Sequence, residues 1–234
     1  NHSLNVVAAF SYERGDYGNK AMVATGFPQD LTEDFDMSAA VNPQKPTSGR
    51  GMTSLVSFLG RANYNLMNKY LFTASFRRDG SSKFAPGNKW SNFASGAIAW
   101  RASEEQFIKD LNLFSNLKFR ASYGQTGNQA IGAYATRDYL TVANYPINGA
   151  LSSGFANLTW RGPANPDLKW ETTSQYNVGV DMGFLQNRIN LTVDLYYKKT
   201  SDLLQNIQIP QSTGFSNMTT NFGNVTNKGL EITG

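Results

Sequence analysis

The sequence predicts an all-β protein, an antiparallel transmembrane β-barrel segment of about eight strands. Two observations lead to this class. Residues 167–200 hold two long runs in which apolar and polar side chains alternate, joined at Gln186-Asn187. The connections between the predicted strands include tight turns on one side and long loops on the other, which is the pattern of outer-membrane barrels.

The segment 167–200 is the clearest hairpin of the chain. Even-numbered positions of 168–184 are mostly apolar, and after the turn the odd-numbered positions of 189–197 are apolar. Successive side chains of a strand point to opposite faces, so this hairpin has one apolar and one polar face. The register that keeps apolar residues together pairs Phe184 with Ile189, Val180 with Val193 and Tyr176 with Tyr197.

The length of these two arms favours a membrane barrel. Each arm keeps its alternation for about a dozen residues, whereas an ordinary strand has about 5–6 and a tilted membrane-spanning strand about 9–11. A long hairpin in a soluble β-sandwich is the alternative at this point.

The other strands are predicted from the same alternation, at residues 3–14, 54–66, 70–77, 89–101, 117–124 and 221–234. Met67-Asn68-Lys69 forms a tight turn, in which Asn68 is the candidate for a left-handed backbone conformation. Ser103 to Gln106 has the spacing of a capping box and predicts a short helix into Phe107-Ile108.

The connections between these strands are predicted to lack regular structure. Long polar or glycine-rich segments cover 15–51, 125–166 and 201–219, and the remaining links are medium or short. Long loops of this kind usually carry function.

The composition restricts the class of protein further. The 234 residues have a net charge of +4, with Lys and Arg spread along the strands, so no nucleic-acid partner is predicted. The mean hydropathy is −0.41, and no apolar run approaches the roughly 18 residues of a membrane helix. These values exclude a helical membrane protein but allow a barrel, whose lumen-facing half is polar. The chain starts without Met or a signal peptide. It has no cysteine, and this absence fits an oxidising envelope compartment.

Few residues are available for catalysis or for metal binding. His2 is the single histidine and cysteine is absent, so no catalytic triad and no zinc or iron site is predicted. Glu33, Asp34 and Asp36 could hold Ca²⁺ but lack the calcium-loop spacing, and a solvated loop is favoured. We therefore predict no enzyme, no cofactor and no metal.

Two further patterns have a chemical and a structural interpretation. Gly124 to Asn128 resembles a phosphate-binding loop only in its glycines, and we predict a strand that leads into a loop. Composition allows a pair of Asp or Glu residues for glycoside hydrolysis, but Glu171, Asp181 and Asp194 are explained as polar-face positions of the strands.

Four blocks of sequence carry a more specific signal: KYLFTASFRRDGSSKFAPGNKWSNFASGAIAWRASEEQF at 69–107, LKFRASYGQTGNQAIGAY at 117–134, NPDLKWETTSQYNVGVDMGFLQNRINLTVDLYYKKTSDLL at 165–204 and NFGNVTNKGLEITG at 221–234. In this order they resemble SusC/RagA-type TonB-dependent transporters of Bacteroidetes. The match covers nearly all of the chain apart from two loops.

This resemblance implies a barrel of about 22 strands in the Gram-negative outer membrane, with a plug domain in the lumen. Residues 1–234 would be part of the barrel domain, and the plug domain would lie outside this chain. The resemblance also implies import of oligosaccharides or peptides, energised by TonB-ExbB-ExbD, beneath a SusD-like lipoprotein that acts as a lid. A ferric-siderophore receptor is the alternative within transport. A secreted β-rich adhesin or carbohydrate-binding module, and after it a glycan-degrading enzyme, are the alternatives from other classes.

The loop at 125–166 is the predicted contact region for substrate or lid. Exposed aromatic and arginine side chains stack on sugars and anchor partner proteins. Packing of these side chains against one another within the loop is an alternative of equal weight. The residues concerned are Arg137, Tyr139, Tyr145, Phe155, Trp160 and Arg161.

Overall fold

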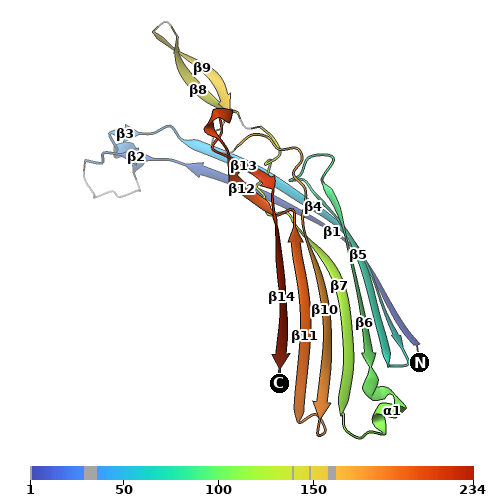
Figure 1. Ribbon diagram of the computed structural model, residues 1–234. Helices are drawn as coiled ribbons and strands as arrows, with labels where there is room; N and C mark the ends of the chain where they lie inside the picture. The colour runs from blue at the N-terminus through green and yellow to red at the C-terminus, as the bar shows by residue number, and fades with distance from the viewer. Residues whose placement is uncertain (1, 29–35, 139, 148, 158–161) are drawn as a thin grey trace.

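Eight long strands form one antiparallel sheet in the computed structural model, which describes residues 2–28, 36–138, 140–147, 149–157 and 162–234. The strands pair in chain order and build a twisted, curved wall (Figure 1). Their bounds are β1 (His2–Ala21), β4 (Thr47–Leu66), β5 (Tyr70–Ser81), β6 (Trp90–Arg101), β7 (Asn116–Asn128), β10 (Glu171–Phe184), β11 (Ile189–Ser201) and β14 (Asn224–Thr233). The predicted eight-stranded antiparallel segment is confirmed.

The predicted registers are also confirmed. β10 and β11 pair Phe184 with Ile189 and Tyr176 with Tyr197. Between β4 and β5, Lys69 N–H donates to the carbonyl of Leu66 at 3.0 Å, which closes the tight turn. Asn68 has the expected left-handed conformation, with a φ of 59°, and Met67 is also left-handed, with a φ of 56°. Positive φ at both central residues gives the turn the twist that antiparallel strands require.

Two predicted loops are shorter than expected, because strands continue into them. The ladder between β1 and β4 extends from His2–Leu66 to Ala21–Thr47, so the predicted loop at 15–51 is wrong over much of its length. β7 likewise continues through 124–128, where an exit into a loop was predicted. Backbone hydrogen bonds alone can extend an antiparallel ladder. Where neither face of the strand has to be apolar, polar residues and glycine occupy every position, so the sequence shows no alternation from which a strand could be predicted.

The long connections contain small two-stranded hairpins that the sequence analysis missed. The β8–β9 hairpin projects away from the main sheet (Figure 1). The three pairs are β2 (Ala24–Thr25) with β3 (Asn42–Pro43), β8 (Leu140–Ile147) with β9 (Ala150–Asn157), and β12 (Leu204–Gln208) with β13 (Asn217–Asn221). We call the end of the sheet that carries these hairpins the loop end. The opposite end, with the links 67–69, 102–115 and 185–188, is the turn end.

Short helices occur only in the connections of the described chain. At the turn end, η2 (Ala102–Glu104) precedes α1 (Gln106–Lys109), and η1 (Met37–Ala39) and η3 (Gln211–Thr213) lie at the loop end. The predicted helix into Phe107 is confirmed, but the capping box is wrong. Glu105 is the residue at the N-cap, and it makes no side-chain cap hydrogen bond. None of the described helices has the length and apolar character needed to cross a membrane.

Glu105 instead ties the turn end together. Its carboxylate accepts hydrogen bonds from Lys69 Nζ at 2.7 Å and from the Tyr70 hydroxyl at 2.8 Å. These contacts hold the pKa of the Glu105 carboxyl below its usual value, and the contact with Lys69 has a larger effect than the contact with Tyr70. The link between β6 and β7 is thereby anchored to the turn between β4 and β5.

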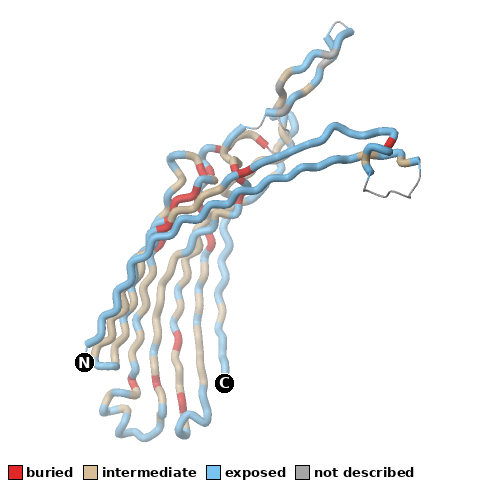
Figure 2. The backbone as a smooth tube through the Cα atoms, turned by 180° about the vertical axis from the view of Figure 1, so that it is seen from behind, coloured by how far each residue is buried: buried red, intermediate tan, exposed pale blue. Residues whose placement is uncertain are grey.

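A hydrophobic core lies where the connections meet the sheet at the loop end. It contains Phe84, Phe93, Ile131, Leu168 and Trp170, and Leu168 is completely buried. Buried residues gather mainly in this region (Figure 2). Trp170 Nε1 also donates to the carbonyl of Lys89 at 3.0 Å, and its ring packs edge-on against Phe93. Three connections and the sheet are thus fixed to one another.

Candidate functional site

The two faces of the sheet differ in chemistry. The first, which we call the apolar face, has large hydrophobic side chains that no other part of the described chain covers. A soluble monomer rarely exposes so large an apolar surface, whereas a membrane-spanning wall turns such a surface to lipid. Its members include Leu4, Val6, Phe10, Phe72, Ile98, Val178, Leu195 and Leu230, all more than 40% exposed.

A row of tyrosines crosses the apolar face on three neighbouring strands. The ring centroids of Tyr123 and Tyr176 are 4.7 Å apart, and those of Tyr176 and Tyr197 are 6.4 Å apart. One position further toward the loop end on β10 and β11, the same face carries Ser174 and Lys199. Aromatic rings at a border between apolar and polar positions are typical of the membrane–water interface. The row therefore marks the border of the lipid-facing zone on the loop side.

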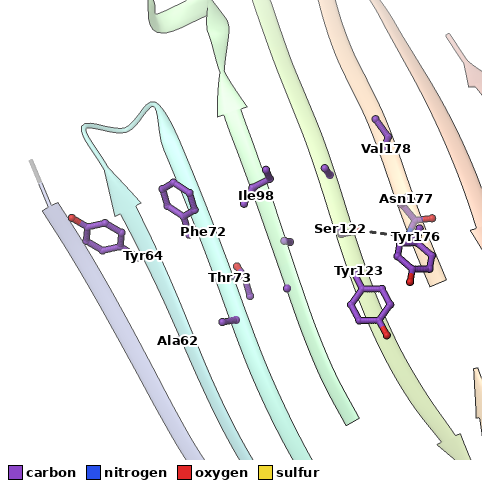
Figure 3. A pocket seen from close by; sticks show the side chains of 14 residues that line it. Ala62, Tyr64, Phe72, Thr73, Ile98, Ser122, Tyr123, Tyr176, Asn177 and Val178 are labelled. Atoms are coloured by element: carbon purple, nitrogen blue, oxygen red, sulfur yellow. Dashed lines mark hydrogen bonds between the residues drawn. The ribbon is translucent and has the colours of Figure 1, made fainter. Parts of the chain in front are cut away.

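A shallow groove of about 600 Å³ lies beside this row (Figure 3). Its floor consists of small residues, among them Ala62, Ala74 and Gly96, between larger rings on either side. The residues of the apolar face that line the groove are Ala62, Tyr64, Phe72, Ala74, Gly96, Ile98, Ala121, Tyr123, Tyr176 and Val178. The groove has the chemistry of a lipid-facing surface and has few groups that could orient a polar substrate.

The opposite, polar face is held by an ion cluster across β7, β10 and β11. Arg120 Nε and Nη2 donate to the two carboxylate oxygens of Asp181, each at 2.9 Å. Arg120 Nη2 also lies 3.1 Å from Asp194. The expected placement of Asp181 and Asp194 on the polar face is confirmed. Because one guanidinium engages both carboxylates, the pair serves strand cohesion and is not arranged as an acid and a base for hydrolysis.

Glu171 also has a structural role. Its carboxylate accepts hydrogen bonds from Asn128 Nδ2 at 3.1 Å and from the backbone N–H of Leu204 at 3.0 Å. Glu171 therefore links β7 and β10 to the first residue of β12.

A second polar group lies closer to the loop end on the same face. Arg77 Nε contacts both oxygens of Asp79 at 2.7 and 2.8 Å, and Arg77 Nη2 donates to the Ser57 hydroxyl at 3.1 Å. Asp79 and Ser57 are buried. These side chains border a concavity of about 400 Å³, lined by Leu59, Arg61, Ser75, Arg77, Asp79, Phe93, Ser95, Gln125, Thr126 and Gly127. Sequence reasoning missed this site, because its residues come from four strands and only the register brings them together.

The predicted contact residues of the loop at 125–166 are only partly placed. Arg137 is exposed and lies over the ring of Tyr134, with 5.8 Å between its guanidinium carbon and the ring centroid. Tyr145 is on β8 and Phe155 is on β9, where Phe155 pairs with Val142. Tyr139, Trp160 and Arg161 lie outside the described residues. Their role in binding stays a prediction.

The candidate metal ligands do not form a cluster in the described chain. No group of three or more His, Cys, Asp or Glu side chains there is arranged to hold a metal ion. Asp36 instead accepts the backbone N–H of Ser38 at 3.1 Å and caps η1, while Glu33 and Asp34 lie outside the described residues. His2 Nδ1 is hydrogen-bonded to the Tyr64 hydroxyl at 2.7 Å.

An antiparallel sheet with an apolar outer face, an interfacial aromatic row and a polar inner face defines the wall of an outer-membrane β-barrel. Comparison with known families identifies the kind of outer-membrane barrel. The chain belongs to the TonB dependent receptor-like, beta-barrel family, whose model matches residues 1–234. Members of this family are transporters of the Gram-negative outer membrane and not enzymes, as the sequence analysis expected.

Individual relatives agree with the SusC/RagA type. The chain is 42% identical over 185 residues to the TonB-dependent receptor SusC of Bacteroides thetaiotaomicron, covering 76% of this chain and 18% of that protein. It is 37% identical over 236 residues to the TonB-dependent receptor P3 of Formosa agariphila, covering 99% of this chain and 23% of that protein. The solved structure of the RagAB peptide transporter superposes with a TM-score of 0.80 at 29% identity, over 98% of this chain and 25% of that chain. The chain thus spans less than a quarter of the length of these two curated relatives.

Proposed function

We propose that the protein containing this chain imports oligosaccharides or peptides across the outer membrane. TonB-ExbB-ExbD supplies the energy, and a SusD-like lipoprotein covers the outer opening of the barrel. In this proposal the apolar face contacts lipid, and the polar face lines the lumen through which the substrate passes. The loop end lies at the cell surface, and the turn end lies on the periplasmic side.

The two-faced wall is the observation that carries the proposal. Ion clusters and hydroxyl groups cover one side of the sheet, while large apolar and aromatic side chains cover the other between the turn end and the tyrosine row. Similarity to a structure described as a peptide transporter, and to SusC, supports an organic nutrient as the cargo.

Surface loops are the expected contact region for the lid or for the arriving substrate. The β8–β9 hairpin projects beyond the sheet at the loop end (Figure 1), where a covering lipoprotein would sit. Arg137, Tyr145 and Phe155 belong to this region, and we assign Tyr139, Trp160 and Arg161 to the same contact from the sequence.

Uptake by cells tests the proposed transport. A strain that lacks the full-length gene is complemented with the gene and supplied with fluorescent oligosaccharides and peptides of several sizes. The proposal expects uptake that depends on the gene, on TonB and on the neighbouring lipoprotein. Uptake that persists without TonB would contradict energised transport. In a parallel assay with a ferric siderophore, uptake of that probe together with no uptake of the oligosaccharides and peptides would favour the alternative receptor class.

The loop contact is tested separately with alanine at Trp160 and Arg161. We expect weaker uptake or weaker co-purification of the lipoprotein, with normal assembly of the barrel. Arg188→Ala is the matched control, since Arg188 lies in the turn at the opposite end of the sheet. Equal uptake and equal lipoprotein binding in the loop variants and the control would remove these residues from the contact.

A further inference from the structure

The concavity on the polar face contains two arginines in very different states. Arg77 is immobilised, because Asp79 and Ser57 engage its Nε and Nη2. The side chain of Arg61, on the neighbouring strand β4, has no hydrogen-bond or ion-pair partner among the residues that the structure describes, and Arg61 is exposed. An unpaired guanidinium keeps all five of its N–H donors for another group.

Hydroxyl groups continue from Arg61 along the floor of the concavity. The register places Arg61 opposite Ser75 and Ser75 opposite Ser95, so the three residues form one row across β4, β5 and β6. The Ser75 and Ser95 hydroxyl oxygens are 2.6 Å apart. Such a row offers both donors and acceptors beside the free guanidinium.

The charge of the concavity is positive. Arg61 and Arg77 contribute two positive charges and Asp79 one negative charge, so the titratable side chains that line it sum to +1. Asp79 is already neutralised by Arg77 at 2.7 Å. The uncompensated charge is therefore located at Arg61.

We infer that this concavity is a binding subsite for an oxyanion, a carboxylate or a sulfate carried by the transported molecule, with Arg61 as the residue that binds it. The inference rests on the proposed transport function and assigns a substrate class to the polar face. A planar guanidinium binds two oxygens of such a group at once. The hydroxyl groups of Ser75 and Ser95 can donate hydrogen bonds to the adjacent part of the ligand or accept hydrogen bonds from it. Arg77 engages Asp79, the one acidic side chain of the concavity, so Asp79 does not compete with the ligand for Arg61.

Calorimetric titration of the purified full-length transporter tests this assignment. The probes are three oligosaccharides of equal length, one neutral, one with uronate carboxylates and one sulfated, together with an acidic peptide and its amidated counterpart. We expect the wild-type protein to bind at least one anionic probe more tightly than its neutral counterpart. Arg61→Gln should weaken that binding by about 10- to 100-fold and leave the affinity for the neutral probe unchanged.

Two further variants separate the subsite from a general effect of charge. Arg61→Lys keeps the charge but loses the two-pronged geometry, so we expect an intermediate loss. Arg101→Gln is the matched control, since Arg101 is on the same face of β6 but outside the concavity, and its anion affinity should equal that of the wild type.

The inference is overturned if Arg61→Gln weakens neutral and anionic probes alike, as loss of a contact with another part of the protein would do. It is also overturned if the wild type shows no preference for anionic probes, or if Arg101→Gln has the same effect as Arg61→Gln. Failure of the subsite is distinguishable from failure of transport. TonB-dependent uptake of neutral probes that is insensitive to Arg61→Gln would leave the proposed function intact and remove only the oxyanion site.

Discussion

Arg120 on β7 holds Asp181 on β10 with two hydrogen bonds of 2.9 Å, and the same guanidinium reaches Asp194 on β11 across Gly179. The absence of a side chain at Gly179 makes this arrangement possible. A Cβ at that position would overlap the Asp194 carboxylate and approach Arg120 Nη2. The cluster therefore depends on both the charges and the glycine between them.

Replacing Arg120 by Ala should destabilise the barrel wall, because two carboxylates on neighbouring strands would then lack their shared cation. The side chains are about one-quarter to one-third exposed, so solvent screening lowers the cost from the value for a buried pair to about 1–3 kcal/mol. Thermal unfolding of the full-length protein in detergent measures this change. Arg188→Ala, in an exposed turn, should have little effect, and equal melting temperatures for both variants would contradict the proposed role of the cluster.

The contact between Glu105 and Lys69 predicts a pH dependence at the turn end. The folded pKa of Glu105 is lowered, first by Lys69 and then by Tyr70, so its stabilising contribution is complete above the unfolded pKa of about 4.3. This contribution is lost as the pH falls through the lower folded value. The protection factors of the amides in 102–110, which are corrected for the intrinsic pH dependence of hydrogen exchange, should therefore fall in acid for the wild type.

Glu105→Gln should show the lower protection factors already at neutral pH and little further change in them in acid. Glu104→Gln is the control. Its pair with Lys109 is about half exposed on both sides, so the effect should be small. Equal exchange rates in the wild type and in Glu105→Gln at pH 7 would refute the anchoring role.

Trp170 should control the order of the surface connections without affecting the strands. Trp170→Ala removes a buried ring from the loop-end core and should cost about 3–5 kcal/mol, expressed as local opening. Trp170→Phe keeps most of the packing and loses the hydrogen bond to Lys89, at about 1 kcal/mol. Limited proteolysis of intact cells should cut the Ala variant within 82–89 or 163–170, and Trp90→Ala on the exposed apolar face should resist. Resistance of Trp170→Ala would contradict a shared core.

The sequence predicted the strands well where lipid imposes a pattern. The alternation in 168–197 fixed the register of β10 and β11, since a slip by one residue would expose polar groups to lipid. The extension of β1 to Ala21 and the hairpin β8–β9 escaped prediction, because no apolar face is required there. Trp170 continues the apolar parity of β10, yet the strand begins at Glu171 and the ring packs against Phe93. Likewise, only the register of β4 and β5 brings Arg61, Arg77 and Asp79 to one concavity.

Neighbouring positions on β6 provide a matched test of the lipid-facing surface. Ile98→Lys places a charge on the apolar face and should destabilise the protein in lipid by about 2–4 kcal/mol if the residue lies near the bilayer midplane. Ala97→Lys, one residue away, places the same charge on the polar face and should be tolerated. Refolding yields of the full-length protein in phospholipid vesicles compare the two variants. Equal yields would show that β6 has no lipid-facing side.

Cysteine scanning tests the central claim most directly, and within this chain no native cysteine competes for the label. Single cysteines at the adjacent pairs Asn177 and Val178 on β10, and Asp194 and Leu195 on β11, are introduced into the full-length protein in the outer membrane. The account predicts that a water-soluble maleimide labels positions 177 and 194, and that a lipid-soluble quencher reaches probes at 178 and 195. Water-soluble labelling of both members of each pair would contradict a membrane-spanning wall.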